Sequence, residues 1–194
     1  MRLFVAVYPP QELAADLSSL VETLALGRRA AEGAHVKLSP VEHWHVTVAF
    51  LGEVDDDRLP DVTEALEKAL ASWRVERAAL PTLRLSGGGR FNQGASTVLW
   101  AGLHGDVASL TSLASAVSTQ LKRAGLPTDP KPFRPHLTLG RPGDQLTSAE
   151  VESDLAKLGA HAGPSWTVDE LVLVRSHLDP EPRYEQLTVL PLAA

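Results

Sequence analysis

Two short segments of the sequence resemble each other. Residues 45–52 are HVTVAFLG and residues 136–143 are HLTLGRPG. The two segments share His, Thr and the final Gly, and they exchange Val for Leu at the second and fourth positions. They begin nearly half the chain apart. An internal repeat of this kind indicates two related halves, each built around one copy of the motif.

Each copy has the alternating pattern of a strand with one buried face. Because successive side chains of a strand point to opposite faces, the His and the Thr of one copy point the same way. The Val or Leu residues beside them point to the other face and anchor the strand in a core. The residues on the polar face are His45, Thr47, His136 and Thr138.

Two imidazoles and two hydroxyls that meet between facing lobes suit phosphoester cleavage without a metal. Cleavage needs a base for the attacking water and an acid for the leaving oxygen, and histidine, with a pKa of about 6.5, can supply both near neutral pH. Hydroxyls can donate to the phosphate oxygens, and Arg141 offers a positive charge. A single such motif more often completes a hydrogen-bond network, whereas two copies in matching context favour catalysis.

The rest of the chain mixes helical and strand patterns without strict βαβ alternation, which favours the α+β class. Glycine and proline positions and apolar periodicity predict the element boundaries. The predicted helices cover residues 13–28, 59–73 (with Asp55–Asp57 as capping carboxylates), 107–121 and 148–158. The predicted strands cover residues 3–8, 45–51, 80–85, 97–103, 136–139, 166–174 and 184–190, with a glycine-rich loop at 86–94.

Composition limits the class of partner. The chain has 18 basic and 24 acidic residues, a net charge of −6, and no basic stripe that could follow a long nucleic acid. A nucleic-acid substrate is therefore expected to be engaged at one end or one phosphate. Without cysteine there is no thiolate ligand or disulfide, and no apolar run approaches the roughly 18 residues of a membrane span. We expect a cytoplasmic protein that does not enter a membrane.

A metal site is not expected. His43 and His45 could supply two ligands from one strand face, but no third ligand has suitable spacing, and catalytic zinc uses three. The glycines at 87–89 lack the Lys-Ser/Thr of a P-loop, so a glycine-rich hairpin connection is the better interpretation.

Several stretches outside the repeat also resemble the sequences of a known family. The chain resembles the two-histidine phosphoesterase superfamily and, within it, the LigT-like RNA 2′,3′-cyclic phosphodiesterases, which are also called 2′-5′ RNA ligases. The resemblance covers roughly residues 2–191. It rests on the paired motifs and on RLFVAVYPP (2–10), VLWAGL (98–103), FRPHLTLGR (133–141) and LVLVRSHLDPEPRYEQL (171–187).

The resemblance implies a single two-lobed domain over residues 1–194, with antiparallel-rich sheets of two pseudo-symmetric lobes flanking a central cleft and helices outside. It also implies a reaction without metal or cofactor, and we expect the protein to be a monomer. In the matching positions His45 and His136 are the acid and base, and Thr47 and Thr138 hold the phosphate. The near-symmetric repeat leaves the two histidine roles open, and we expect His136 to be the base and His45 the acid.

The resemblance further implies that Phe50 and Arg141, each five residues after a histidine, contact the terminal base, with Arg141 also reaching the phosphate. In a regular strand an offset of five points these side chains to the face opposite the histidines. Phe50 would then be a core residue and Arg141 a surface arginine, unless each strand ends or twists before Gly52 and Gly143.

The implied activity is hydrolysis of an RNA-terminal 2′,3′-cyclic phosphate to a 2′-phosphate, with 2′-5′ ligation as the minor reverse reaction. Two alternatives remain open from the sequence. The substrate could be a small cyclic nucleotide, which the negative net charge mildly favours, or the chain could bind RNA ends without catalysis.

Overall fold

The computed structural model describes residues 1–76, 79–93, 96–178 and 182–193. In these residues nine strands form one sheet, and every strand pair is antiparallel. The strands are β1 (Arg2–Val7), β2 (Lys37–Leu38), β3 (Val46–Glu53), β4 (Thr82–Gln93), β5 (Ser96–Gly105), β6 (Leu137–Arg141), β7 (Ala162–Thr167), β8 (Glu170–His177) and β9 (Arg183–Pro191). The helices are α1 (Gln11–Thr23), α2 (Ala25–Ala31), α3 (Leu59–Glu76), α4 (Val107–Arg123) and α5 (Ser148–Ala160), with short 3₁₀ turns η1 (Val41–His43) and η2 (Asp56–Arg58).

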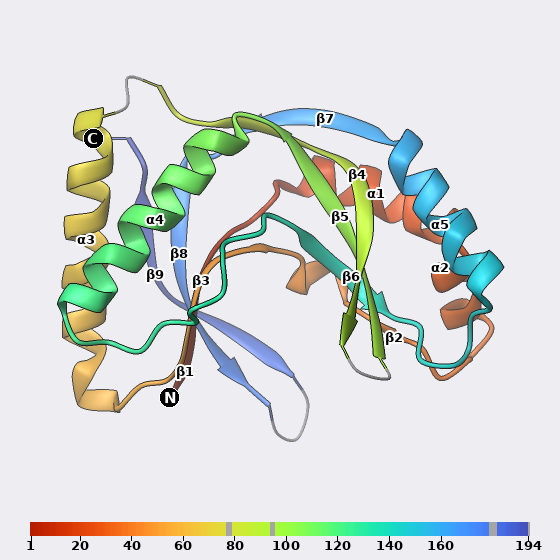
Figure 1. The fold of residues 1–194 in the computed structure, drawn as a ribbon, viewed down its shortest axis with the longest axis horizontal. Coiled ribbons are helices and arrows are strands. Elements are labelled where there is room, and N and C mark those ends of the chain that lie inside the picture. The colour runs from red at the N-terminus through yellow and green to blue at the C-terminus, as the bar shows by residue number, and fades with distance from the viewer. Residues whose placement is uncertain (77–78, 94–95, 179–181, 194) are drawn as a thin grey trace.

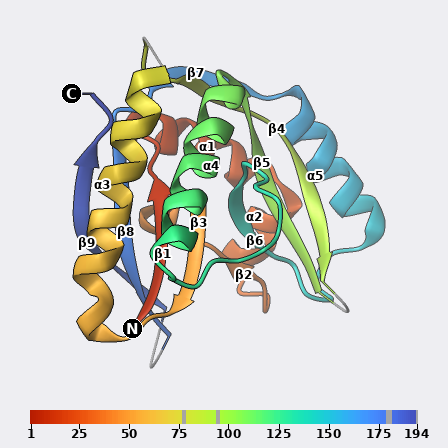
Figure 2. The same cartoon turned by 60° about the vertical axis from the view of Figure 1, so that its left-hand side comes forward.

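The strand order divides the molecule into two lobes. It reads β7-β4-β5-β6-β3-β1-β8-β9, with β2 paired to β6, so β6 and β3 stand at the middle. Helices α3 and α4 accompany the β3-β1-β8-β9 side, and α1, α2 and α5 accompany the other side (Figures 1 and 2). This arrangement confirms the predicted α+β, two-lobed fold.

The two faces of the sheet differ in what covers them. Alternate residues of β1 and β8, such as Leu3 and Leu173, join the large core that includes the buried helix residues. The intervening residues form a second apolar cluster made of Phe4, Ala6, Val172 and Val174, with no helix residue among its described members. We call the face that carries this second cluster the open face.

The amphipathic stripes predicted for two helices are confirmed. Both stripes point into the main core, and only their first residues, Leu59 and Val107, are partly buried. The fully buried members are Val62, Leu66, Leu70 and Trp73 of α3 and Leu110, Leu113, Val117 and Leu121 of α4. No described helix has the length and apolar character needed to cross a membrane.

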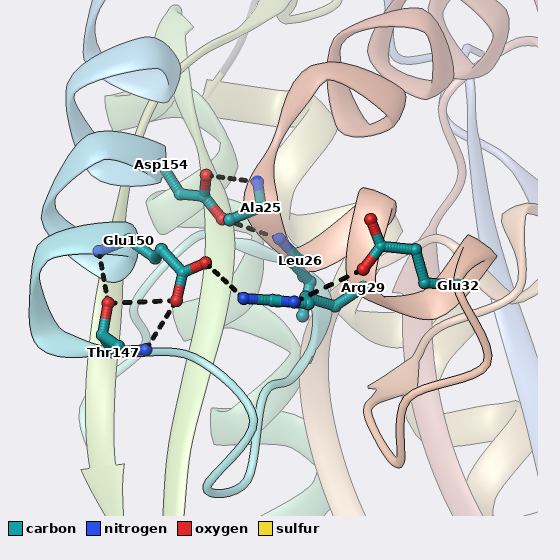
Figure 3. Close-up of polar contacts among 7 residues, drawn as sticks. All are labelled: Ala25, Leu26, Arg29, Glu32, Thr147, Glu150 and Asp154. Carbon is teal, nitrogen blue, oxygen red and sulfur yellow. Dashed lines mark hydrogen bonds and ion pairs between the residues drawn. The ribbon is translucent and has the colours of Figure 1, made fainter.

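The predicted helix over residues 13–28 is wrong in one respect, because the chain breaks at Leu24 into α1 and α2. Leu24 has extended backbone angles of φ −73° and ψ 153°. The buried carboxylate of Asp154 in α5 accepts hydrogen bonds from the backbone N–H groups of Ala25 at 2.7 Å and Leu26 at 3.0 Å (Figure 3). Unpaired N–H groups at a helix start need such acceptors, so a residue far away in the sequence stabilises the break.

The glycine-rich segment is a strand rather than the predicted loop over 86–94. Residues 82–93 all belong to β4, which pairs with β5 on one side and β7 on the other, while residue 94 lies outside the described residues. A Cβ at Gly89 would overlap the indole of Trp100, and one at Gly88 would lie 2.8 Å from the Cβ of Leu158. Glycine is needed here because neighbouring groups cross the strand closely, not because the chain turns.

Two smaller predictions also differ from the structure. The single strand predicted at 166–174 is the end of β7 and most of β8, with the chain passing between them at Val168 and Asp169. Asp55 makes no side-chain cap hydrogen bond, and Asp56 and Asp57 lie in the 3₁₀ turn η2 instead of capping α3.

Replacing Asp154 should destabilise the fold although the residue is far from the histidines. Asp154 is 1% exposed, and Asp154→Asn would set an amide N–H₂ against one of the two backbone donors. We expect a loss of about 2–4 kcal/mol in the free energy of unfolding, measured by urea denaturation. The control is Glu152→Gln on the same helix α5, where Glu152 forms an exposed ion pair with Arg90 of β4; it should cost below about 1 kcal/mol. Equal stability of the two variants would contradict the anchoring role of Asp154.

Candidate active site

The two copies of the repeat meet at the centre of the sheet. Val46 of β3 pairs with Leu137 of β6, and this is the register pair that joins the two strands. Both residues are fully buried in the main core. Because the pairing is antiparallel, each motif histidine, one residue before Val46 or Leu137, stands across from the threonine of the other motif. The two histidines and two threonines are therefore neighbours on the open face.

His45 is held by hydrogen bonds at both ring nitrogens. Its Nδ1 lies 2.7 Å from the backbone carbonyl oxygen of His43, and its Nε2 lies 3.1 Å from the hydroxyl oxygen of Thr47. A carbonyl can only accept, so Nδ1 must carry a proton and donate it. In the neutral ring Nε2 then carries the lone pair, which accepts a hydrogen bond from the Thr47 hydroxyl and is the atom that can take up a proton.

His136 has the same arrangement in the second copy. Its Nδ1 lies 2.6 Å from the carbonyl oxygen of Arg134, again the residue two positions earlier. Nδ1 therefore donates here too, and Nε2 is again the exchanging nitrogen. Among the described residues no hydrogen bond is made to the Nε2 of His136. The two rings present the same atom to a group bound between them, one as an acceptor and the other, when protonated, as a donor.

Burial changes the acidity of His45. Loss of solvent lowers its pKa below the usual value, and the positive charges that His136 and His43 carry when protonated lower it further. The hydrogen bond to the carbonyl of His43 acts in the opposite direction but does not cancel the effect of burial. In the free protein at neutral pH the neutral form of His45 is therefore favoured.

A β-bulge at the same position of each motif brings Phe50 and Arg141 to the open face. In β3 the register shifts between the pairs Val5–Ala49 and Ala6–Thr47, so Val48 is the extra residue. In β6 it shifts between Leu99–Gly140 and Trp100–Thr138, so Leu139 is the extra residue. One extra residue reverses the alternation beyond it. The expectation from a regular strand, which points residues at an offset of five away from the histidines, is thus wrong for both motifs.

Phe50 and Arg141 leave the central pair in opposite directions along the antiparallel strands. Phe50 packs against the second apolar cluster, and the guanidinium carbon of Arg2 lies 4.8 Å from its ring centroid. Arg141 is exposed and lies close enough to Tyr184 for its charge to oppose the rise that burial causes in the pKa of that phenol. The two histidines thus have an aromatic side chain on one side and a cation on the other.

Aromatic side chains that sequence spacing did not identify surround His45. Its ring centroid lies 4.8 Å from that of Phe4, 5.8 Å from Tyr8 and 5.4 Å from Tyr184. Burial, and then the neighbouring charge of Tyr184, raise the pKa of Tyr8 to about 12. Burial also raises the pKa of Tyr184, so both phenols keep their protons at neutral pH. Only cross-strand pairing brings β1 and β9 to the motif, which is why no spacing in the sequence indicated these neighbours.

His136 has an aromatic pair of its own. The ring of Phe91 lies 4.9 Å from that of His136 at an interplanar angle of 85°, and it stacks on Trp100 at 5.2 Å and 29°. Trp100 stands opposite Thr138 in the sheet and crosses over Gly89. The segment VLWAGL contains Trp100, but a role for it follows only from this pairing.

Metal-binding groups are not gathered near the motifs. Over the described residues, no three or more His, Cys, Asp or Glu side chains come together as metal ligands would. His43 instead packs beside Tyr184, with ring centroids 4.7 Å apart.

The lowered pKa of His45 has a measurable consequence. Its ring should titrate below pH 6.5 in NMR spectra of the free protein, and inorganic phosphate should move the midpoint upward because an anion favours the imidazolium. The unfolded chain binds the proton more readily, so His45 contributes stability above about pH 6.5 that is lost as the pH falls through the folded pKa. A midpoint at or above 6.5 without phosphate would contradict the burial argument.

The sequence of this chain is similar to those of known proteins. Residues 9–180 match the family model described as "2'-5' RNA ligase superfamily". A curated relative from Archaeoglobus fulgidus, named RNA 2',3'-cyclic phosphodiesterase, is 31% identical over 192 residues, which is 97% of this chain and 99% of the relative. A relative with the same name from Thermus thermophilus is 31% identical, and the alignment covers 93% of this chain and 84% of the relative. The chain spans about half the length, 46%, of a third relative of that name from Geobacillus stearothermophilus.

Solved structures agree with the fold. A protein from Thermus thermophilus superimposes with a TM-score of 0.70 at 29% identity and covers 99% of this chain and 98% of its own. Escherichia coli LigT, solved with 3'-AMP, superimposes with a TM-score of 0.64 at 24% identity over 100% of this chain and 98% of its own. The second likeness supports the two-lobed architecture alone.

Proposed function

The chain belongs to the 2′-5′ RNA ligase superfamily, and on that premise we propose that it hydrolyses RNA-terminal 2′,3′-cyclic phosphates to 2′-phosphates. The observation that carries the proposal is the pair of histidines at the centre of the sheet. Each fixes its Nδ1 proton on a backbone carbonyl and so offers its Nε2 for proton exchange. Relatives named RNA 2',3'-cyclic phosphodiesterase, one of which aligns over 97% of this chain, support the same reaction.

The reaction needs one proton acceptor and one proton donor. Water attacks the phosphorus, and a neutral Nε2 takes the proton that the water loses. The bond from phosphorus to O3′ breaks, and a protonated Nε2 on the other histidine gives its proton to O3′. The product carries a 3′-hydroxyl and a 2′-phosphate, and the two histidines have exchanged protonation states. Solvent restores them, so the cycle balances without a cofactor.

The remaining motif residues stabilise the charge that develops on the phosphate. The hydroxyls of Thr47 and Thr138 stand beside the two histidines and can donate to the non-bridging oxygens, where the charge increases in the transition state. Arg141, which the bulge directs to the same face, supplies a full positive charge. We propose that Phe50 offers its face to the terminal base and that Arg141 contacts both base and phosphate.

We assign the base to His136 and the acid to His45. A lowered pKa makes the protonated His45 a stronger donor toward the poor O3′ leaving group, and a bound phosphate counteracts the cost of charging it. The neutral form of His136, whose Nε2 has no described partner, is free to accept from a water.

We further propose that residues 1–194 act as one two-lobed catalytic domain, as a monomer, in the cytoplasm. The continuous sheet supports the first point, since β3 and β6 join the lobes and each, together with the histidine that precedes it, supplies half of the motif residues. The absence of cysteine from the sequence is compatible with a reducing compartment.

Alanine at either histidine should abolish most of the activity. With an RNA oligomer ending in a 2′,3′-cyclic phosphate, in EDTA, we expect His45→Ala and His136→Ala each to lower kcat by about 10²–10⁴-fold. His104→Ala, at an exposed position of β5, is the matched control and should keep wild-type activity. Loss of wild-type turnover in EDTA would contradict metal-independent hydrolysis, and turnover that survives both motif substitutions would refute the assigned residues.

The acid and base can be separated with a substrate that needs no acid. Sulfur in place of O3′ leaves readily as a thiolate, so protonation of the leaving group is no longer required. On this 3′-thio cyclic phosphate His45→Ala should regain most of the wild-type rate, whereas His136→Ala should stay inactive. The opposite pattern of rescue, measured as the ratio of rates on the two substrates, would exchange the two roles.

A further inference from the structure

The short strand β2 adds a second cation to the open face beside Arg141. Strand β2 pairs with the end of β6, where Lys37 stands directly opposite Arg141 and Leu38 opposite Gly140. Cross-strand partners have Cβ atoms about 4.5–5.5 Å apart and project from the same face of the sheet. The side chains of Lys37 and Arg141 are therefore neighbours.

The bulge at Leu139 decides which face these two cations share. Gly140 pairs with Leu99, a residue of the main core, and a Cβ on Gly140 would meet the side chain of Leu26 in α2. Gly140 and its partner Leu38 thus face the helices. The next residues along both strands, Arg141 and Lys37, face the other way, toward the face that carries Thr138 and the histidines.

This pair is unfavourable unless an anion joins it. Like charges that stand directly opposite in a sheet destabilise the pairing. None of the ion pairs formed by the described residues includes Lys37 or Arg141, and both side chains are exposed. The sequence has a net charge of −6, so an uncompensated pair of cations next to the active site is a local exception.

We propose that Lys37 binds the internucleotide phosphate one step 5′ of the cyclic phosphate. The inference rests on the proposed function: Arg141 takes the terminal phosphate, and its neighbour Lys37 reaches the next one along the strand. A cyclic mononucleotide has no such phosphate. The Lys37 subsite therefore makes an oligonucleotide end, rather than a small cyclic nucleotide, the preferred substrate.

The test compares substrates that differ only in this phosphate. The first is a diadenosine with an ordinary internucleotide phosphate and a 2′,3′-cyclic end, the second has an uncharged methylphosphonate linkage, and the third is 2′,3′-cyclic AMP. Lys37→Gln should lower kcat/KM about fivefold on the first substrate only, the size of one exposed ionic contact. Lys37→Arg should restore it. The slope of log kcat/KM against log salt for the first substrate should become shallower by about 0.7.

Lys122→Gln, at an exposed position in the last turn of α4, is the matched control and should leave all three rates unchanged. An equal effect of Lys37→Gln on the charged and uncharged linkages, or no effect on any substrate, would overturn the subsite and leave the proposed function intact. Failure of the wild type to hydrolyse any of the three would instead refute the proposed function itself.

Discussion

The pairing of Val46 with Leu137 is the constraint on which the rest of the site depends. Both side chains are fully buried, so the register of β3 against β6 cannot slip by one residue without exposing apolar groups and burying polar ones. The same register sets each histidine across from the threonine of the other motif. Since β3 belongs to one lobe and β6 to the other, hydrophobic packing in the core determines where the imidazoles of the two motifs meet.

The two bulges determine which further side chains of β3 and β6 lie on the open face beside the histidines and threonines. In a regular strand the residue that follows His and Thr on the open face would be Ala49 in one motif and Gly140 in the other. One extra residue, Val48 in β3 and Leu139 in β6, puts Phe50 and Arg141 on that face instead. Because the strands are antiparallel, these two residues lie in different directions from the histidines, Phe50 at the second apolar cluster and Arg141 beside β2 and Lys37. A near-symmetric repeat thereby produces an asymmetric arrangement, with an aromatic side chain on one side of the histidines and a cation on the other.

The sequence predicts well what depends on local periodicity and poorly what depends on distant partners. The stripes of α3 and α4 and the two His-x-Thr faces follow from spacing alone. The break at Leu24 does not, since its cause is the carboxylate of Asp154 in another helix. The glycines of β4 look like a loop because the indole of Trp100 that requires them lies on the next strand. The bulges are invisible for the same reason, so Phe50 and Arg141 could be placed at the site only through the family resemblance.

A crystal structure with an oligonucleotide ending in a 2′-phosphate, the product of the proposed reaction, tests the central claim most directly. The account predicts the phosphorus between the Nε2 atoms of His45 and His136, with both Nδ1 atoms still on the carbonyls of His43 and Arg134. It also predicts hydrogen bonds from Thr47 and Thr138 to the phosphate oxygens. A phosphate bound by one histidine alone, or away from both, would contradict a single site built from the two halves of the repeat.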